Sequence, residues 1–230
     1  MSSVVAINQR ARSADQKALR RRAVLEAAET YFLEVGYEAF SMSKLAKKIG
    51  LSKGTFYLYF QTREELFLTL YEQSLIRWSQ VFIDDLSDSM TSEAYAQKLF
   101  STASADGTFL PLLIRLEHMI EHNVAIPRLI SSKQVFIKQV EAIAEATSIS
   151  LSLSEAQAIE VVKTMGVLLI GATQGDQGPS LDQEELPKDV QNLIASFSSE
   201  PLFIKNAIRV IEGIRSEAVS NSEATQTSNQ

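Results

Sequence analysis

The sequence predicts an all-α protein. Apolar residues recur every three to four positions along most of the 230 residues, which is the period of a helix. Residue pairs with helix-capping spacing precede several of these runs, and Gly or Pro follows several of them. No two neighbouring segments read convincingly as a pair of strands. We therefore expect helices joined by turns.

Composition narrows the class of protein. With 45% hydrophobic and 22% charged residues, the chain has an ordinary globular composition and enough length for its own core. It contains no cysteine, which excludes disulfides and thiolate metal sites and fits a reducing cytoplasm. The N-terminal residues lack the apolar segment of a signal peptide, and no run of about 18 apolar residues indicates a membrane span. We expect a cytoplasmic protein that does not enter a membrane.

The net charge of −6 is unevenly distributed. Residues 1–60 contain ten basic and five acidic residues, a net charge of +5, whereas residues 61–230 contain 12 basic and 23 acidic residues, a net charge of −11. A basic head on an acidic body suggests a polyanionic partner for the head alone. Chance clustering on a solvated face explains the same numbers, so charge leaves both interpretations open.

The first helix is predicted to begin near Ser13 and to end near Gly36. Ser13 and Gln16 have the spacing of a capping box, and Gly36 suits the position that follows a helix. Between them runs an amphipathic stripe of four apolar residues: Val24, Ala28, Tyr31 and Val35.

Two short helices are predicted next, separated by a tight turn at Gly50. The first covers 42–49 and the second 53–60. A capping box at 62–65 opens a long helix, which leaves room for about two helical turns before it. The stretch TFYLYF has the composition of a strand, but its packing period favours a helix. The unit has the layout of a helix-turn-helix, whose second helix enters the DNA major groove.

The second short helix is predicted to have an inner and an outer side. At 100° per residue, Phe56 and Phe60 fall on the inner side, where they meet the first short helix. The outward phase of Leu58 suits contact with a thymine methyl, and the hydroxyl of Tyr57 suits a phosphate. The alternative is a helical corner whose aromatic residues are all core, which we accept for the two phenylalanines.

Residues 14–72 resemble the DNA-binding domain of TetR-family transcriptional regulators. Four motifs carry the resemblance: VGY at 35–37, FSMSKLA at 40–46, GLSKGTFYLYF at 50–60 and TREEL at 62–66. The resemblance implies a homodimer with two DNA-reading heads and C-terminal domains whose ligand changes the spacing of the heads. It implies a repressor that a small molecule releases from a palindromic operator. Two-fold symmetry then predicts half-sites about 34–36 Å, or a multiple, apart.

The resemblance also implies the residues that contact DNA. Base and phosphate contacts fall at six positions: Lys53, Gly54, Thr55, Tyr57, Leu58 and Tyr59. Contacts with the DNA backbone fall at Ser43, Lys44 and Arg63. Position 44 is commonly acidic in the family, so Lys44 adds a phosphate-binding charge and cannot complete a capping box with Ser41. Position 58 is often aromatic or His, so Leu58 suggests an altered base preference.

We divide the chain into four parts. These are a flexible basic arm (1–13), a helix-turn-helix DNA-binding domain (14–62), a helical regulatory and dimerisation domain (63–218) and a disordered tail (219–230). Arg10 and Arg12 in the arm either reach an adjacent minor groove or only keep the chain soluble. After the long helix, further helices are expected at about 93–105, 109–122, 127–146, 153–174 and 201–218, whereas residues 176–200 show no clear pattern.

Dimerisation is expected through helices 153–174 and 201–218, because the last two long helices usually form a four-helix bundle with the partner in this family. Gly166 and Gly171 in the first of them allow close approach. The second offers an apolar stripe of Leu202, Ile204, Ile208, Ile211 and Ile214. Both patterns are equally compatible with an internal core.

The effector cannot be identified from the sequence. Candidate ligand contacts are Trp78, Phe82, Phe109, His118, Met119, Phe136 and His122, and core packing is the alternative for most of the apolar ones. His118 and His122 share one helical face beside two glutamates, as a metal site requires. No third ligand is visible, so a metal-responsive regulator is only an alternative, and we expect neither a bound metal nor another cofactor.

Two other classes of function were weighed. An enzyme is not expected, because there is no cysteine, no G-x-S-x-G or P-loop pattern, and both histidines lie in one short segment. A helical module that binds other proteins is the remaining alternative. It does not explain a basic head that carries tyrosines.

Overall fold

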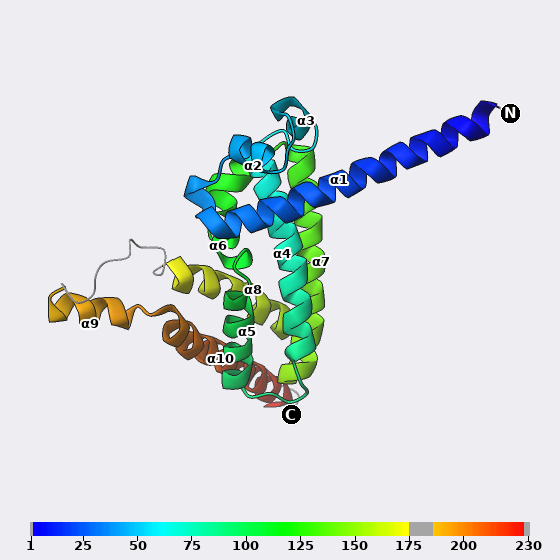
Figure 1. The fold of residues 1–230 in the computed structure, drawn as a ribbon. Coiled ribbons are helices and arrows are strands. Elements are labelled where there is room, and N and C mark those ends of the chain that lie inside the picture. The colour runs from blue at the N-terminus through cyan, green and yellow to red at the C-terminus, as the bar shows by residue number, and fades with distance from the viewer. Residues whose placement is uncertain (1, 175–185, 228–230) are drawn as a thin grey trace.

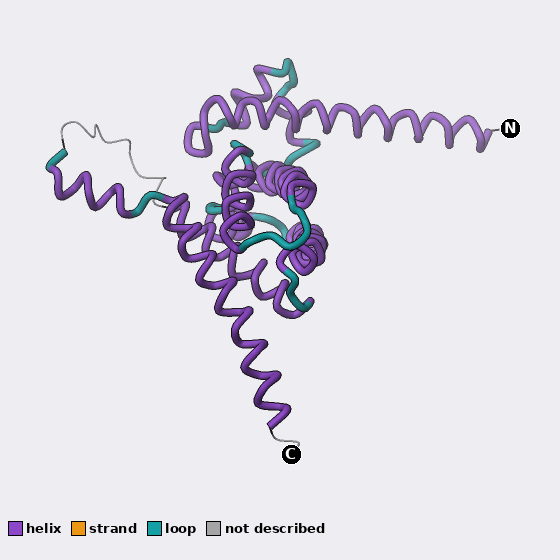
Figure 2. Tube along the Cα trace, turned by 90° about the horizontal axis from the view of Figure 1, so that it is seen from below, coloured by secondary structure: helices purple, strands orange, loops and turns teal. Residues whose placement is uncertain are grey.

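The computed structural model describes residues 2–174 and 186–227, with the side chains of 2–14, 117, 118 and 218–227 outside that description. Every element within the described ranges is a helix, so the predicted all-α class is confirmed. Figure 1 shows a small head of three helices resting over the ends of longer helices. The N-terminal half of the first helix projects away from the rest in both Figure 1 and Figure 2.

The head consists of α1 (Ser2–Ala39), α2 (Met42–Lys48) and α3 (Lys53–Tyr57). The hydroxyls of Ser41 and Ser52 cap α2 and α3 by accepting the amide N–H of the residue three positions later, at 3.4 and 3.1 Å. Gly36 interrupts α1 three residues before its end, with a φ of 72°, and Gly50 lies in the turn after α2, with a φ of 68°. Local capping and turn chemistry thus produce the predicted helix-turn-helix.

A tightly packed aromatic core holds the head together. Phe56 and Phe60 are fully buried, as their inward phase predicts. Phe67 from the next helix stacks on Tyr37 and meets Phe40 at a tilt, with ring centroids 4.7 and 4.8 Å apart. These contacts fix α3 against the body, so its outer side is presented on a rigid base.

Three predicted boundaries are wrong. The first helix begins at Ser2 rather than Ser13, because Ala, Gln and Arg are good helix formers that extend an existing helix. α10 likewise continues to Thr227, where a polar tail was expected. α3 ends at Tyr57 rather than residue 60, since i→i+3 hydrogen bonds tighten its last turn before Phe60 enters the core.

The body is built around α4 (Arg63–Asp85) and α7 (Ile126–Leu151), two long helices that run side by side (Figure 1). Its elements are α4 (Arg63–Asp85), α5 (Ser92–Ala105), α6 (Phe109–Leu113), a π-helix (Leu116–Ile120), a 3₁₀ helix (Glu121–Asn123), α7 (Ile126–Leu151), α8 (Glu155–Thr173), α9 (Lys188–Ser196) and α10 (Ser199–Thr227). α4 packs against α5, α6 and α7, and α8 packs between α7 and α10.

The helix expected over 109–122 is instead three short pieces: α6, the π-helix and the 3₁₀ helix. Leu116 and Ile120 stay buried, while Arg115 lies against Tyr37 of the head. A regular helix does not satisfy both demands, and π-helical turns are a common way to absorb such a mismatch.

Two helices of the body have unusual exposure. By length and composition alone α8 is apolar enough to cross a membrane, but its packing against α7 and α10 explains the same apolarity. α9 stands away from the body (Figure 2) and has no buried residue, although Leu193 and Phe197 are apolar. The stretch 176–200, which shows no clear pattern in the sequence, therefore contains a helix, and residues 175–185 lie outside the described chain.

Candidate nucleic-acid interface and ligand cavity

The outer side of α3 gathers most of the residues expected to contact DNA. Lys53, Gly54, Tyr57 and Leu58 are exposed and form what we call the α3 face, in which 75% of Leu58 is accessible. Thr55 and Tyr59 are half-buried beside it. A leucine this exposed at the end of a packed helix has no role in the core of the chain.

Positive charge surrounds the α3 face. Ser43 and Lys44 are exposed on α2, and the ammonium of Lys53 lies 5.8 Å from the ring centroid of Tyr57. Lys48 forms an ion pair with Glu34 at 2.5 Å, whereas neither Lys44 nor Lys53 has a carboxylate partner within the part of the chain described. The charges nearest the α3 face thus remain available to an anionic partner.

Arg63 lies elsewhere, inside the head. Its guanidinium donates a hydrogen bond to the carbonyl of Tyr37 and lies 4.4 Å from the Tyr37 ring and 5.0 Å from the Phe67 ring. Its Nε is buried without a hydrogen-bond partner among the described residues. The geometry makes Arg63 a clamp between α4 and α1, unlike the exposed residues of the α3 face.

A charged cluster joins the head to the body. Arg77 of α4 donates to Glu29 of α1 at 2.6 Å and to Asp106 at 2.9 Å. The other oxygen of Asp106 accepts the amide N–H groups of Thr108 and Phe109, at 2.9 and 3.0 Å. The hydroxyl of Thr108 also donates to Glu29, at 3.0 Å. The start of α6 is therefore fastened to α1.

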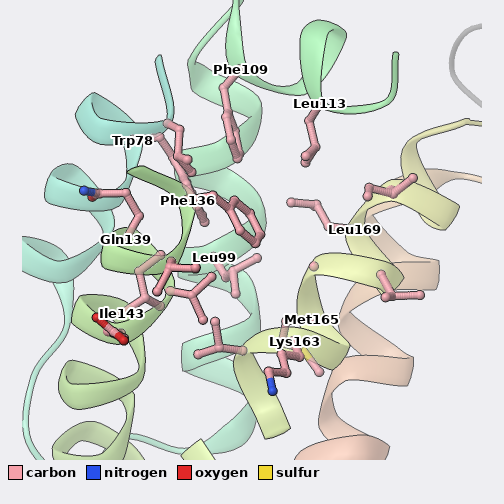
Figure 3. A pocket seen from close by; sticks show the side chains of 18 of the residues that line it. Trp78, Leu99, Phe109, Leu113, Phe136, Gln139, Ile143, Lys163, Met165 and Leu169 are labelled. Atoms are coloured by element: carbon pink, nitrogen blue, oxygen red, sulfur yellow. The ribbon is translucent and has the colours of Figure 1, made fainter. Parts of the chain in front are cut away.

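A cavity of about 630 Å³ lies between α4, α5, α6, α7 and α8. Figure 3 shows Phe109 and Leu113 at one end of it and Lys163 at the other. The rings of Trp78 and Phe109 stack with centroids 4.4 Å apart and form part of the wall. The volume and the apolar wall are those of a small-molecule site.

The ligand candidates read from the sequence divide into two groups. Trp78, Phe109 and Phe136 line the cavity. The remaining candidates with described side chains do not line it: Phe82 is buried behind Trp78, and Met119 and His122 are exposed.

The side chain of His118 lies outside the described residues. The α-helical spacing expected for His118 and His122 is wrong, because the π-helix ends at Ile120 and a 3₁₀ helix follows. The side chains that are described contain no group of three or more metal-ligating residues.

Sequence reasoning missed several cavity residues, among them Tyr71, Gln139 and Lys163. Each belongs to a helix whose periodicity was visible, yet nothing in the period tells a cavity wall from a filled core. The two helices expected at a dimer contact, α8 and α10, differ in how much of their apolar surface is exposed. Ile211 and Ile214 of α10 are buried within the chain, whereas Val167 of α8 is 73% exposed.

Comparison with known proteins divides the chain within the first half of α4. Residues 24–70 match a family model described as "Bacterial regulatory proteins, tetR family". Residues 72–217 match one described as "Tetracyclin repressor-like, C-terminal domain". The two matches together cover the head and the body.

Individual relatives are similar over about a third of the chain. The chain is 28% identical over 78 residues to the fatty acid metabolism regulator protein of Bacillus subtilis (strain 168), covering 34% of this chain and 40% of that protein. It is 33% identical over 67 residues to the HTH-type transcriptional repressor AcnR of Corynebacterium diphtheriae, covering 29% and 35%. The matches thus span at most about two fifths of these curated relatives.

A solved structure extends the similarity to the body. The crystal structure of a TetR transcriptional regulator from Rhodococcus sp. RHA1 superposes with a TM-score of 0.52 at 16% identity, covering 87% of this chain and 97% of that one. At 16% identity, the similarity shows a shared fold and nothing more.

Proposed function

Because this chain belongs to the TetR family of bacterial regulatory proteins, we propose that it is a sequence-specific DNA-binding transcriptional regulator, controlled by a small molecule. The α3 face carries this proposal. It presents a cation, a phenol and an apolar side chain on a helix that Phe56 and Phe60 hold rigidly. Such a combination suits the phosphates and base edges of a major groove.

The proposed DNA contacts are the α3 face together with Ser43, Lys44, Thr55 and Tyr59. Arg63 acts with them indirectly, by holding α4 against α1 beneath the reading head. The regulator works in the cytoplasm as a homodimer through α8 and α10, on a palindromic operator. Repression is the proposed sign of regulation, which the partial similarity of the chain to a transcriptional repressor supports.

The effector is proposed to bind in the cavity. Phe109 and Leu113 of α6 line it, and residues at both ends of α6 touch the head. At one end Asp106 is joined to Glu29 through Arg77, and at the other Arg115 lies 5.2 Å from the Tyr37 ring. An occupant that displaces α6 therefore changes how the head sits, and with it the spacing of two heads in a dimer.

Selection of bound duplexes from a random DNA pool tests this proposal. Purified protein is expected to enrich a palindrome whose half-sites lie about one helical turn apart or a multiple of it. Binding to the enriched duplex should weaken steeply as salt rises, because phosphate contacts release counterions. Enrichment of no sequence over the starting pool contradicts the proposal.

A further inference from the structure

Gly166 lies in the interior of α8 and in the wall of the cavity. A glycine in the middle of a helix destabilises it relative to alanine, so its presence needs a physical reason. Beyond its chain neighbours and its own helix backbone, a Cβ atom added at Gly166 would meet no atom of the described residues within 4 Å. At Gly107, by contrast, an added Cβ would lie 2.8 Å from Leu33 Cδ2. The missing side chain of Gly166 therefore leaves open space within this chain rather than a close contact.

The open space beside Gly166 belongs to the cavity. Four residues lie one helical turn away from it on the same side of α8, and all four line the cavity: Val162, Lys163, Leu169 and Ile170. Gly166 is thus at the centre of the α8 face that forms the wall. Because helix side chains lean toward the N-terminus, a side chain at position 166 would enter the cavity and lean toward Lys163.

Gly166 lies midway along the part of α8 that borders the cavity. Figure 3 shows Leu169 on the side of Phe109 and Leu113, whereas Lys163 lies at the opposite end. Gly166 is three residues from Leu169 and three from Lys163, which places it about 4.5 Å along the helix axis from each. A large side chain at position 166 would therefore divide the cavity into two shorter compartments.

The wall suits an apolar occupant over most of its length. Apart from Gln139, Glu141 and Lys163, every lining residue is hydrophobic or glycine. The side chains of Glu141 and Lys163 are exposed, so they stay in contact with water. An apolar cavity of about 150 Å³ is large enough to hold benzene. This cavity has about 630 Å³, so a molecule that fills it is several times larger than one ring.

We propose that Gly166 sets the length of the ligand that the cavity accepts. The ligand is an elongated, largely apolar molecule that extends from the α6 end of the cavity past Gly166 to the Lys163 end. Gly166 acts through the absence of a side chain, which keeps the two halves of the cavity continuous. This inference rests on the proposal that the cavity is the effector site, but its test needs no DNA.

The n-alkylbenzenes from ethylbenzene to pentylbenzene test it, because they differ only in the number of methylenes. The two test variants are Gly166→Leu and Gly166→Ala. Gly171→Leu is the matched control, since Gly171 lies in the same helix, has equally open surroundings and does not line the cavity. Dissociation constants are measured from the fluorescence of Trp78, which is the single tryptophan of the chain and lines the cavity.

Wild-type and Gly171→Leu proteins are expected to bind each longer homologue about three- to fourfold more tightly than the one before, the worth of one buried methylene. Pentylbenzene should then bind about 30- to 60-fold more tightly than ethylbenzene. In Gly166→Leu, ethylbenzene should bind within about twofold of wild type, whereas the gain over the whole series should fall below about threefold.

Gly166→Ala shows whether a smaller side chain has a smaller effect. Its gain in affinity over the series should lie between those of wild type and Gly166→Leu. Its thermal midpoint without ligand should rise by about 2–4 °C, because alanine favours the helix and meets no neighbour. A midpoint that falls would mean that position 166 is packed, which contradicts the open space on which the proposal depends.

A chain-length series in Gly166→Leu that matches wild type overturns the proposal. So does a shortened series in Gly171→Leu, because the effect would then not depend on the cavity wall. The absence of any gain with chain length in wild-type protein overturns it too. Loss of ethylbenzene binding in Gly166→Leu also contradicts it, since the α6 end should stay open. None of these outcomes bears on whether the protein binds DNA, which the pool selection decides separately.

Discussion

The guanidinium of Arg77 lies between Glu29 of the head and Asp106 of the body, with Nη2 2.6 Å from Glu29 Oε1 and Nε 2.9 Å from Asp106 Oδ2. Asp106 in turn caps the start of α6, whose first residue, Phe109, stacks on Trp78 in the cavity wall. One side chain thus connects the cavity with the first helix of the head. Coupling between two sites requires such an element, which both sites can displace.

Arg77→Met is expected to uncouple the cavity from the head. Hydrogen exchange at the amides of Thr108 and Phe109 should accelerate, and a ligand that binds in the cavity should change DNA affinity less than in wild type. Affinity for the ligand itself should stay within about twofold of wild type, because Arg77 does not line the cavity. Arg22→Met, which removes an exposed ion pair with Glu26 within α1, is the matched control. Unchanged exchange at both amides would contradict this role.

Lys53→Ala and Tyr57→Ala are expected to abolish specific DNA binding while leaving helicity and dimerisation intact. Both side chains are exposed, so neither substitution opens a cavity in the core. Lys53→Ala should also reduce the slope of binding against salt concentration by about one, as the loss of one phosphate contact predicts. Lys138→Ala on α7 provides an exposed cation remote from the α3 face. Unfolding of both α3 variants would indicate that the two residues belong to the core.

Leu58 is expected to contact a thymine methyl. Replacing each thymine of the selected operator with deoxyuridine removes that methyl and nothing else. One such replacement should weaken wild-type binding and have no effect on Leu58→Ala. Leu19→Ala, at a leucine of α1 that is 67% exposed, controls for the loss of a surface leucine. Equal sensitivity of wild type and Leu58→Ala at every position would refute the contact.

Arg63→Ala is expected to lower stability as well as DNA affinity. Its guanidinium lies against both the Tyr37 and Phe67 rings, so its loss should reduce the free energy of unfolding by about 1–3 kcal/mol. Arg63→Lys should not restore it, because an ammonium lacks the planar surface that stacks on rings. Thermal unfolding distinguishes this role from a direct phosphate contact, for which the midpoint would not change.

The sequence predicted the head well because its signals are local. Ser41, Ser52 and Thr62 cap the helices that follow them, and Gly36 and Gly50 adopt a positive φ, at the kink in α1 and in the turn after α2. Each of these features depends on neighbours within four residues. The inward phase of Phe56 and Phe60 follows from the helical period alone.

The cavity could not be predicted from such local sequence signals. It forms where five helices meet, so its wall depends on contacts between residues far apart in the chain. Trp78 and Phe109 were candidates only as apolar side chains, and Phe82, one turn from Trp78, turned out to be filled core.

The central claim is that the α3 face reads a DNA sequence, and one ratio of affinities tests it most directly. Fluorescence anisotropy at about 150 mM salt compares the palindrome obtained by selection with a scrambled duplex of the same composition. The account predicts that the palindrome binds at least about 10³-fold more tightly, the range typical of specific recognition. Equal affinity for the two duplexes would contradict it.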